Sequence, residues 1–235
     1  MALPKLEAPK YSAVLPSTGE SIEYRPYLVK EEKMLLLAME SQDQKQIMNA
    51  VCDLIDVCTF NKVKARKLPI FDVEFLFLKL RAKSVGESTT LRMKCQSEEC
   101  DALTDVEVNL DFVQVQMPEK INNKVEITES VGIVMKYPTL ETVKMNPEAN
   151  QFDTMMEVLI GCVDYIYDEN DVYPAAESSK QELTDFIESL NSDQFKRVQQ
   201  FFEDAPKVES DMNWKCVSCG HDNSLKIQGL QSFFE

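Results

Sequence analysis

The chain has 235 residues, of which 25 are lysine or arginine and 40 are aspartate or glutamate, so its formal net charge at pH 7 is −15. Its length suits one large domain or two small ones, and a hydrophobic content of 44% is enough for a core. A surface this acidic repels phosphate groups, so we expect neither nucleic-acid binding nor binding to an anionic membrane. The single histidine, His221, excludes mechanisms that need a histidine base or several histidine ligands.

No segment approaches the roughly 18–20 consecutive apolar residues of a membrane span. Residues 1–10 contain no continuous apolar stretch, so we expect no signal peptide and a protein that stays in a reducing cytoplasm. Seven cysteines in that compartment are not expected to form a disulfide framework. A compact set of them indicates a metal site instead.

The first 87 residues are expected to form an arm, a hairpin and helices, because the apolar spacing changes from strand-like to helical near residue 29. A turn that contains proline and glycine, at 16–19, separates the two strands of the hairpin. Ser41 is the expected N-cap of the second helix, and Pro69 opens the third. In chain order, we expect an arm at 1–10, strands at 11–15 and 22–27, and helices at 29–39, 41–58 and 69–80.

From residue 88 the apolar residues alternate with polar ones, which predicts strands. Thr139 is a candidate cap of a short helix, and the apolar run from Phe152 to Ile166 predicts one buried helix. The acidic run at 168–171 matches no calcium-binding loop and is expected to be a solvated loop. The remaining expected elements are strands at 88–94, 103–112, 125–127 and 131–135, helices at 179–190 and 193–202, and a closing hairpin at 214–227.

Two cysteine pairs carry the strongest chemical signal. Cys95 and Cys100 form the first pair, and Cys216 and Cys219 form the second; each pair lies between a strand that ends in Lys-Cys and a returning strand. Tight turns of this kind hold two thiolates on one side of a metal, and Zn²⁺ takes four such ligands in a tetrahedron. The sequence therefore predicts a closed, structural zinc site of four cysteines, in which two distant hairpins form a zinc ribbon.

Several alternatives stay open at this site. The four thiols could be unligated, since the first pair has four intervening residues rather than two, or Cys216 and Cys219 could serve a transient redox role. His221 could replace a cysteine as ligand, although a solvated turn residue fits its position better. Lys94 and Lys215 would offset part of the negative charge of a zinc–thiolate centre. The remaining cysteines are expected to pack in the core as small hydrophobic residues: Cys52, Cys58 and Cys162.

No catalytic constellation accompanies the cysteines. The chain has no phosphate-binding glycine loop, no Gly-x-Ser-x-Gly motif, and no histidine placed to activate a serine or cysteine. We therefore expect a protein that is not an enzyme and has no small-molecule substrate. The apolar tail at 230–235 either docks on its own domain or inserts into a partner.

Both ends of the chain resemble the T4-type (myovirus) phage baseplate hub family. At the C-terminal end the resemblance rests on Trp214–Gly220, Gly229–Leu230 and Phe233–Phe234. At the N-terminal end it rests on Pro16–Gly19, Ile22, Tyr24–Pro26 and Leu28–Lys33. The resemblance implies a late phage protein that binds hub and tail proteins as a hub subunit or assembly factor, either in the host cytoplasm during assembly or in the tail baseplate of the virion. The alternatives are a zinc-ribbon regulator that binds a polymerase and a thiol oxidoreductase.

These observations together predict an α+β protein with three parts. Residues 1–87 would form the N-terminal arm, hairpin and helices. Residues 88–112 and 210–235 would form the zinc-ribbon-like module. Residues 113–209 would form an inserted lobe of strands and helices.

Overall fold

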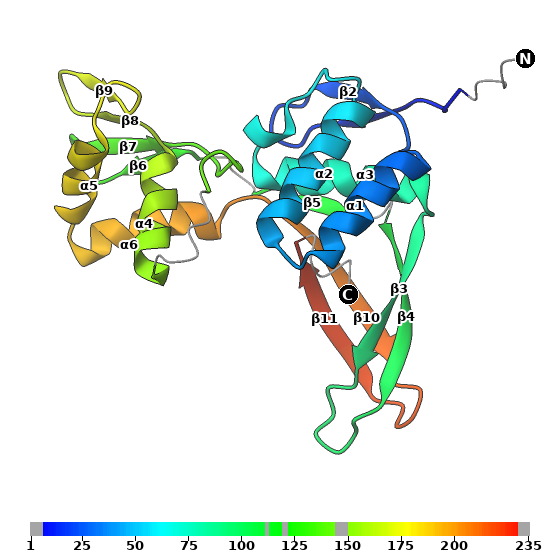
Figure 1. The fold of residues 1–235 in the computed structure, drawn as a ribbon. Helices are drawn as coiled ribbons and strands as arrows, with labels where there is room; N and C mark the ends of the chain where they lie inside the picture. Colours follow the sequence, from blue (N-terminus) through cyan, green and yellow to red (C-terminus); the bar gives the residue numbers. More distant parts are fainter. Residues whose placement is uncertain (1–6, 111–112, 119–121, 144–149, 230–235) are drawn as a thin grey trace, which may run out of the picture. The chain divides into compact units, whose positions relative to one another are not determined.

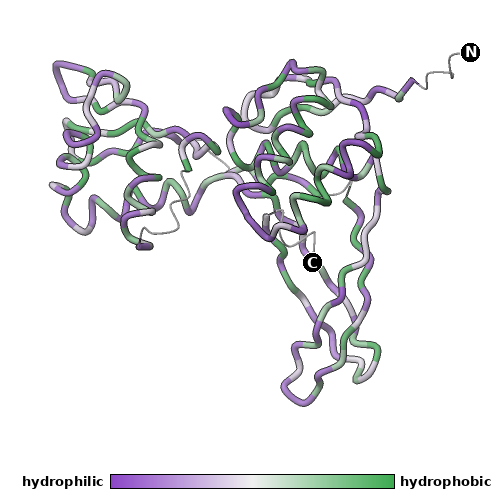
Figure 2. Tube along the Cα trace, in the orientation of Figure 1, coloured by the Kyte–Doolittle hydropathy of each residue, from purple (hydrophilic) through white to green (hydrophobic). Residues whose placement is uncertain are grey.

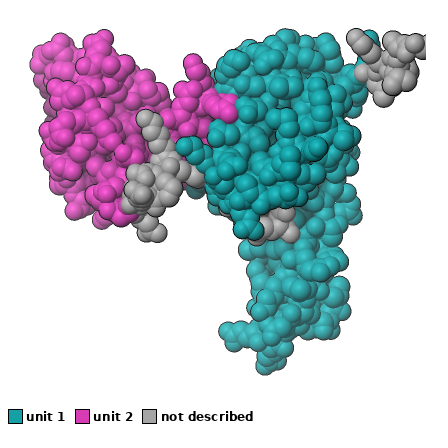
Figure 3. All heavy atoms as spheres, in the orientation of Figure 1, with its two compact units in different colours: residues 1–65, 71–116, 207–235 teal, residues 66–70, 117–206 magenta. Residues whose placement is uncertain are grey.

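The computed structural model describes residues 7–110, 113–118, 122–143 and 150–229. The chain divides into two compact units (Figure 3). Unit 1 comprises residues 1–65, 71–116 and 207–235, and unit 2 comprises residues 66–70 and 117–206. Each unit combines helices with antiparallel strands, so the fold is α+β, as expected (Figure 1).

Unit 1 is built from helices, a short hairpin and two longer hairpins. Its strands pair as β1 with β2, as β3 with β4, and as a three-stranded sheet in the order β11-β10-β5. Its elements are β1 (Tyr11–Val14), β2 (Ser21–Tyr24), α1 (Val29–Glu40), α2 (Gln44–Cys58), α3 (Ile70–Ser84), β3 (Ser88–Lys94), β4 (Leu103–Asn109), β5 (Gln114–Gln116), β10 (Lys207–Lys215) and β11 (Asp222–Gln228). A 3-10 turn spans Ala65–Lys67.

The core of unit 1 is formed mainly by α2 and α3, in which hydrophobic residues recur along the chain (Figure 2). Phe77 and Ile55 are completely buried, and so are Cys52 and Cys58, which confirms their expected packing role. The turn between β1 and β2 is fixed to α3, because the backbone N–H and the hydroxyl of Ser17 both donate to the buried carboxylate of Asp72.

Unit 2 consists of a four-stranded antiparallel sheet and three helices. The strand order is β6-β7-β8-β9, and β7 has all four residues buried. A single cluster that includes Ile133, Cys162 and Val198 packs the sheet against the helices. The elements are β6 (Lys124–Glu126), β7 (Gly132–Met135), α4 (Gln151–Gly161), β8 (Val163–Tyr167), β9 (Val172–Pro174), α5 (Lys180–Glu188) and α6 (Ser192–Glu203).

The helix expected over 152–166 is wrong in its last third. Helix α4 ends at Gly161, Cys162 is its C-cap, and residues 163–167 form strand β8. Val163 and Ile166 are buried in the sheet, where β8 pairs with β7 on one side and β9 on the other. Tertiary pairing of these β-branched and aromatic residues overrides a run of apolar residues that is equally compatible with a buried helix.

Two further expectations about helix ends are corrected. Asp43, not Ser41, is the N-cap of α2, because its carboxylate accepts hydrogen bonds from the N–H groups of Lys45 and Gln46. Ser41 instead donates to the carbonyl of Ala38 at the end of α1. Thr139 caps a turn rather than a helix within the part of the chain that the structure describes.

The N-terminal arm and the C-terminal tail fall largely outside the described residues, which exclude 1–6 and 230–235. Within the described ranges, no helix is both long enough and apolar enough to span a bilayer.

Candidate metal centre

The four cysteines of the two pairs come together in unit 1. Hairpins β3–β4 and β10–β11 run alongside each other, with their connecting loops at the same end (Figure 1). The first loop carries Cys95 and Cys100, and the second carries Cys216 and Cys219. All four sulfur atoms lie within 4.8 Å of one another.

The distances between sulfur atoms fit a tetrahedral metal site. Cys95 Sγ lies 3.7 Å from Cys219 Sγ, and Cys100 Sγ lies 3.8 Å from Cys216 Sγ. With Zn–S bonds of about 2.3 Å, the edge of a tetrahedron is about 3.8 Å. A disulfide would need about 2.05 Å, and all four residues are free thiols. The arrangement is that of four metal ligands rather than of two disulfides.

Backbone hydrogen bonds fold each loop tightly around its cysteines. The N–H of Cys216 donates to the carbonyl of His221, and the N–H of Gly220 donates back to the carbonyl of Cys216. Gly220 has φ +74°, a left-handed conformation that favours glycine. In the first loop, the N–H of Cys95 donates to Ala102 and that of Cys100 donates to Ser97. Both loops therefore turn their two thiols to the same side.

Polar contacts between the two hairpins supplement the cysteines. The buried side chain of Asn223 accepts from the N–H of Gln96 at 2.7 Å and donates to the carbonyl of His221 at 2.9 Å. The side chain of Gln96 also donates to the carbonyl of Ser224 and accepts from its N–H. Conversely, the N–H of Val217 donates to the hydroxyl of Thr104.

These contacts follow an internal pseudo-symmetry. Thr104 pairs with Met93, two residues before Cys95, while Asn223 pairs with Trp214, two residues before Cys216. Each of these two polar residues accepts a hydrogen bond from the residue that follows the first cysteine of the other hairpin. Neither residue was predicted from the sequence to belong to the site. The available signal was a small polar side chain at an inward position of a strand, at the same distance from each cysteine pair.

The electrostatics of the site favour a bound cation. The amide N–H groups of Cys219 and Ser218 point at the sulfur of Cys216 and lower its pKa to about 6. The amide of Ser97 lowers the pKa of Cys95, but burial and the adjacent sulfur atoms of Cys219 and Cys216 raise it overall. Four thiols so close together cannot all ionise to thiolates without a counter-charge. A divalent metal ion supplies that charge, so the donor set suits one.

The lysines beside the cysteines have carboxylate partners. Lys94 Nζ lies 2.7 Å from Asp101, and Lys215 Nζ lies 3.7 Å from Asp222. Both lysine side chains are about two-thirds exposed, at 66% and 69%. The two lysines were expected to offset the charge of the thiolates. The neighbouring aspartates instead neutralise most of the lysine charge.

His221 is exposed and is not one of the four clustered residues. Its backbone contributes to the site: the carbonyl accepts from Cys216 and Asn223, and the N–H points at the sulfur of Cys219. With four cysteine donors, a bound metal would have no open position for water, which is typical of structural rather than catalytic sites.

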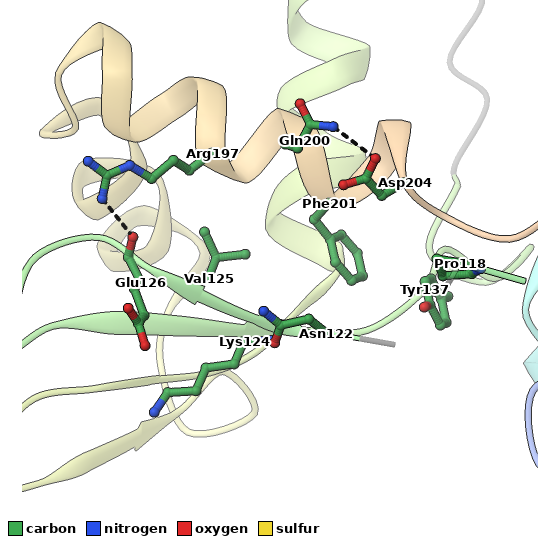
Figure 4. Close-up of a pocket in the computed structure, with 10 residues that line it drawn as sticks. All are labelled: Pro118, Asn122, Lys124, Val125, Glu126, Tyr137, Arg197, Gln200, Phe201 and Asp204. Carbon is green, nitrogen blue, oxygen red and sulfur yellow. Dashed lines mark hydrogen bonds between the residues drawn. The ribbon is translucent and has the colours of Figure 1, made fainter. Parts of the chain in front are cut away.

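A separate cavity of about 450 Å³ lies in unit 2 (Figure 4). Arg197 donates to the backbone carbonyls of Glu126 and Ile127, and Gln200 donates to Asp204. These hydrogen bonds support the local structure around the cavity. The cavity is lined by Pro118, Asn122, Lys124, Val125, Glu126, Tyr137, Arg197, Gln200, Phe201 and Asp204.

The acidic loop at 168–171 is also structural. The carboxylate of Asp168 accepts hydrogen bonds from the N–H groups of Asn170 and Asp171 and from the hydroxyl of Tyr173. These bonds close the turn between β8 and β9 and lower the pKa of Asp168.

The sequence matches a family described as T4 bacteriophage base plate protein over residues 8–235. No curated protein and no solved structure shows significant similarity to the chain. The match extends over both units and includes both cysteine pairs. The chain therefore belongs to the T4 bacteriophage base plate protein family.

Proposed function

We propose that this baseplate protein acts in building the central hub of the phage tail baseplate, as a hub subunit or an assembly factor that binds hub components. Membership of the baseplate family carries this proposal, since it implies contacts with other phage tail proteins. The finer assignment to the hub comes from the resemblance of residues 16–33 and 214–234. The protein acts by binding rather than by catalysis.

The proposed mechanism gives zinc a structural part. Cys95, Cys100, Cys216 and Cys219 hold a Zn²⁺ ion that joins hairpins β3–β4 and β10–β11. The support is the pair of distances of 3.7 and 3.8 Å between sulfur atoms of opposite hairpins. Zinc binding in small peptides contributes on the order of 10 kcal/mol to folding, so the metal would fix a module made from two distant segments.

The zinc assignment is tested by native mass spectrometry and metal analysis. The purified protein should carry one zinc ion per chain, and Cys216→Ser should lose it, together with binding to hub components. Cys162→Ala is the matched control, because Cys162 is a buried free thiol of unit 2 outside the cluster. A Cys216→Ser/Cys219→Ser variant that keeps its fold and its partners would contradict the structural role.

The hub assignment is tested by mass spectrometry of purified virions and infected-cell lysate. A few copies per virion would identify a hub subunit, while a protein abundant in lysate but missing from virions would be an assembly factor. In either case, pull-down from infected cells should recover hub proteins. Recovery of a polymerase instead, or DNA binding at low salt, would favour the zinc-ribbon regulator and refute the hub role.

A further inference from the structure

Helix α1 exposes an apolar face. Val29, Met34, Leu36 and Leu37 are exposed at 80%, 60%, 54% and 56%, while on the opposite side Leu35 is buried. Apolar residues thus occupy both faces of this helix. A group of large apolar side chains exposed together is typical of an interaction surface, so the outer face of α1 is expected to contact another surface.

The helix is held rigidly enough to present that face. The side chain of Glu31 is buried and accepts from the guanidinium of Arg25 at 3.0 Å and from the N–H of Leu28 at 2.6 Å. The N–H of Tyr27 donates to the hydroxyl of Ser84 on α3. These contacts fix the start of α1 and keep its outer residues turned to solvent.

The charges on the outer face of α1 are arranged so that they can pair with the charges on the same face of a second copy. Lys33 and Glu40 are both exposed and lie seven residues, or about two turns, apart, with Leu36 and Leu37 between them. A 180° rotation about an axis that is perpendicular to the helix and passes between Leu36 and Leu37 exchanges the positions of Lys33 and Glu40. A second copy packed antiparallel would therefore place each lysine opposite a glutamate and bring the leucines together.

We propose that α1 mediates a two-fold association of this chain, with its outer face packed antiparallel against α1 of a second copy. Two-fold interfaces use the same patch on both subunits, and the exchange of charge about the leucine pair meets that requirement. A helix of a different protein would need no such internal symmetry. The inference is independent of the proposed hub role and of zinc.

The dimer is expected to be weak in isolation. Helix α1 has 12 residues, a length of about 18 Å. One helix face on each subunit lies at the small end of interface sizes, which is typical of transient contacts. Association should therefore depend on concentration in the micromolar to near-millimolar range.

Sedimentation velocity of the full-length protein over that range tests the proposal. The wild type should shift from monomer to dimer. Leu36→Asp should remain monomeric. Lys33→Glu should weaken dimerisation about tenfold, because two-fold symmetry places residue 33 of each copy opposite Glu40 of the other, and both pairs become repulsive. The Lys33→Glu/Glu40→Lys variant should restore the wild-type behaviour. Lys64→Glu, at another exposed position of unit 1, controls for net charge.

Four results would overturn the proposal. The protein could stay monomeric at every concentration, or dimerise with no effect of Leu36→Asp. Dimerisation only after deletion of residues 230–235 would show that the apolar tail of the same chain occupies the face instead. Failure of the charge exchange to rescue Lys33→Glu would assign any dimer to another geometry.

Discussion

Substitution of Glu31 by alanine should destabilise unit 1 more than the same substitution at the other glutamates of α1, Glu32 and Glu40. Glu31 is 6% exposed, and its carboxylate contacts Arg25 at 3.0 and 3.4 Å and the N–H of Leu28 at 2.6 Å. Loss of the hydrogen bond between the Leu28 N–H and the Glu31 carboxylate at the helix start costs about 1 kcal/mol. Removal of one partner from a buried ion pair costs roughly 3–5 kcal/mol. Because the Arg25 side chain keeps 15% exposure and a bond to the Pro26 carbonyl, we expect a total loss of about 2–4 kcal/mol.

Urea unfolding followed by Trp214 fluorescence measures this loss, because Trp214 is the single tryptophan and lies in unit 1. Glu32→Ala is the matched control, since it removes a more exposed carboxylate from the same helical turn and should change stability by less than about 0.5 kcal/mol. Equal effects of Glu31→Ala and Glu32→Ala would refute the role given to the Arg25 contact.

The stabilities of the wild type and of Glu31→Ala should also differ in their dependence on pH. Burial raises the pKa of Glu31, but the bonds from Arg25 and from the N–H of Leu28 outweigh it, so the pKa in the folded state is lowered. A carboxylate with a lowered folded pKa contributes stability above its ordinary pKa and loses it as the pH falls through the folded value. The difference between wild type and Glu31→Ala should thus be full at neutral pH and shrink in acid. A difference that grows in acid would contradict this assignment.

Three other substitutions test separate parts of the molecule. Asn223→Ala should cost about 1–3 kcal/mol and lower zinc affinity in a chelator competition without changing the stoichiometry; unchanged affinity would argue against its bridging role. Asp72→Asn should raise stability to urea at pH 7, because burial raises the pKa of Asp72 despite the bonds from Ser17, so the carboxylate costs stability as the pH rises; the gain should vanish below about pH 4. Gly132→Ala should lower the melting temperature by an equivalent of about 1–3 kcal/mol, since a new Cβ would overlap the ring and hydroxyl of Tyr167. The additional change Tyr167→Leu should recover part of that loss.

Features that depend on local patterns could be predicted from the sequence. The hairpin around Gly19, helices α1, α2, α5 and α6, and both cysteine hairpins have clear periodicity or turn residues, and the structure contains each of them. The clustering of the four cysteines followed from two similar loops, each between antiparallel strands. Local physics decides these elements, because turn chemistry and apolar spacing act within a few residues.

Features that depend on partners distant in the chain could not be predicted. The three-residue strands β5 and β9 exist because β10 and β8 supply their pairing, and their own sequences are too short to show alternation. The change from helix to strand near Cys162 likewise depends on the edge that β7 offers. The contacts of Asn223 and Thr104 required the register of two hairpins that are separated by more than a hundred residues in the chain.

The cysteine module has two independent means of holding its hairpins together, and they differ in what they require. The hydrogen bonds of Asn223, Gln96 and Thr104 join the hairpins through neutral groups. The sulfur atoms, in contrast, lie at ligand spacing but oppose one another electrostatically unless a cation is bound, because an ionised Cys216 disfavours ionisation of its neighbours. The hydrogen bonds can thus align the two loops before metal binding, and a bound metal would let all four thiols ionise and would become the strongest link between the loops. It follows that removal of the proposed zinc ion should loosen the loops first and leave the cores of α2 and α3 folded.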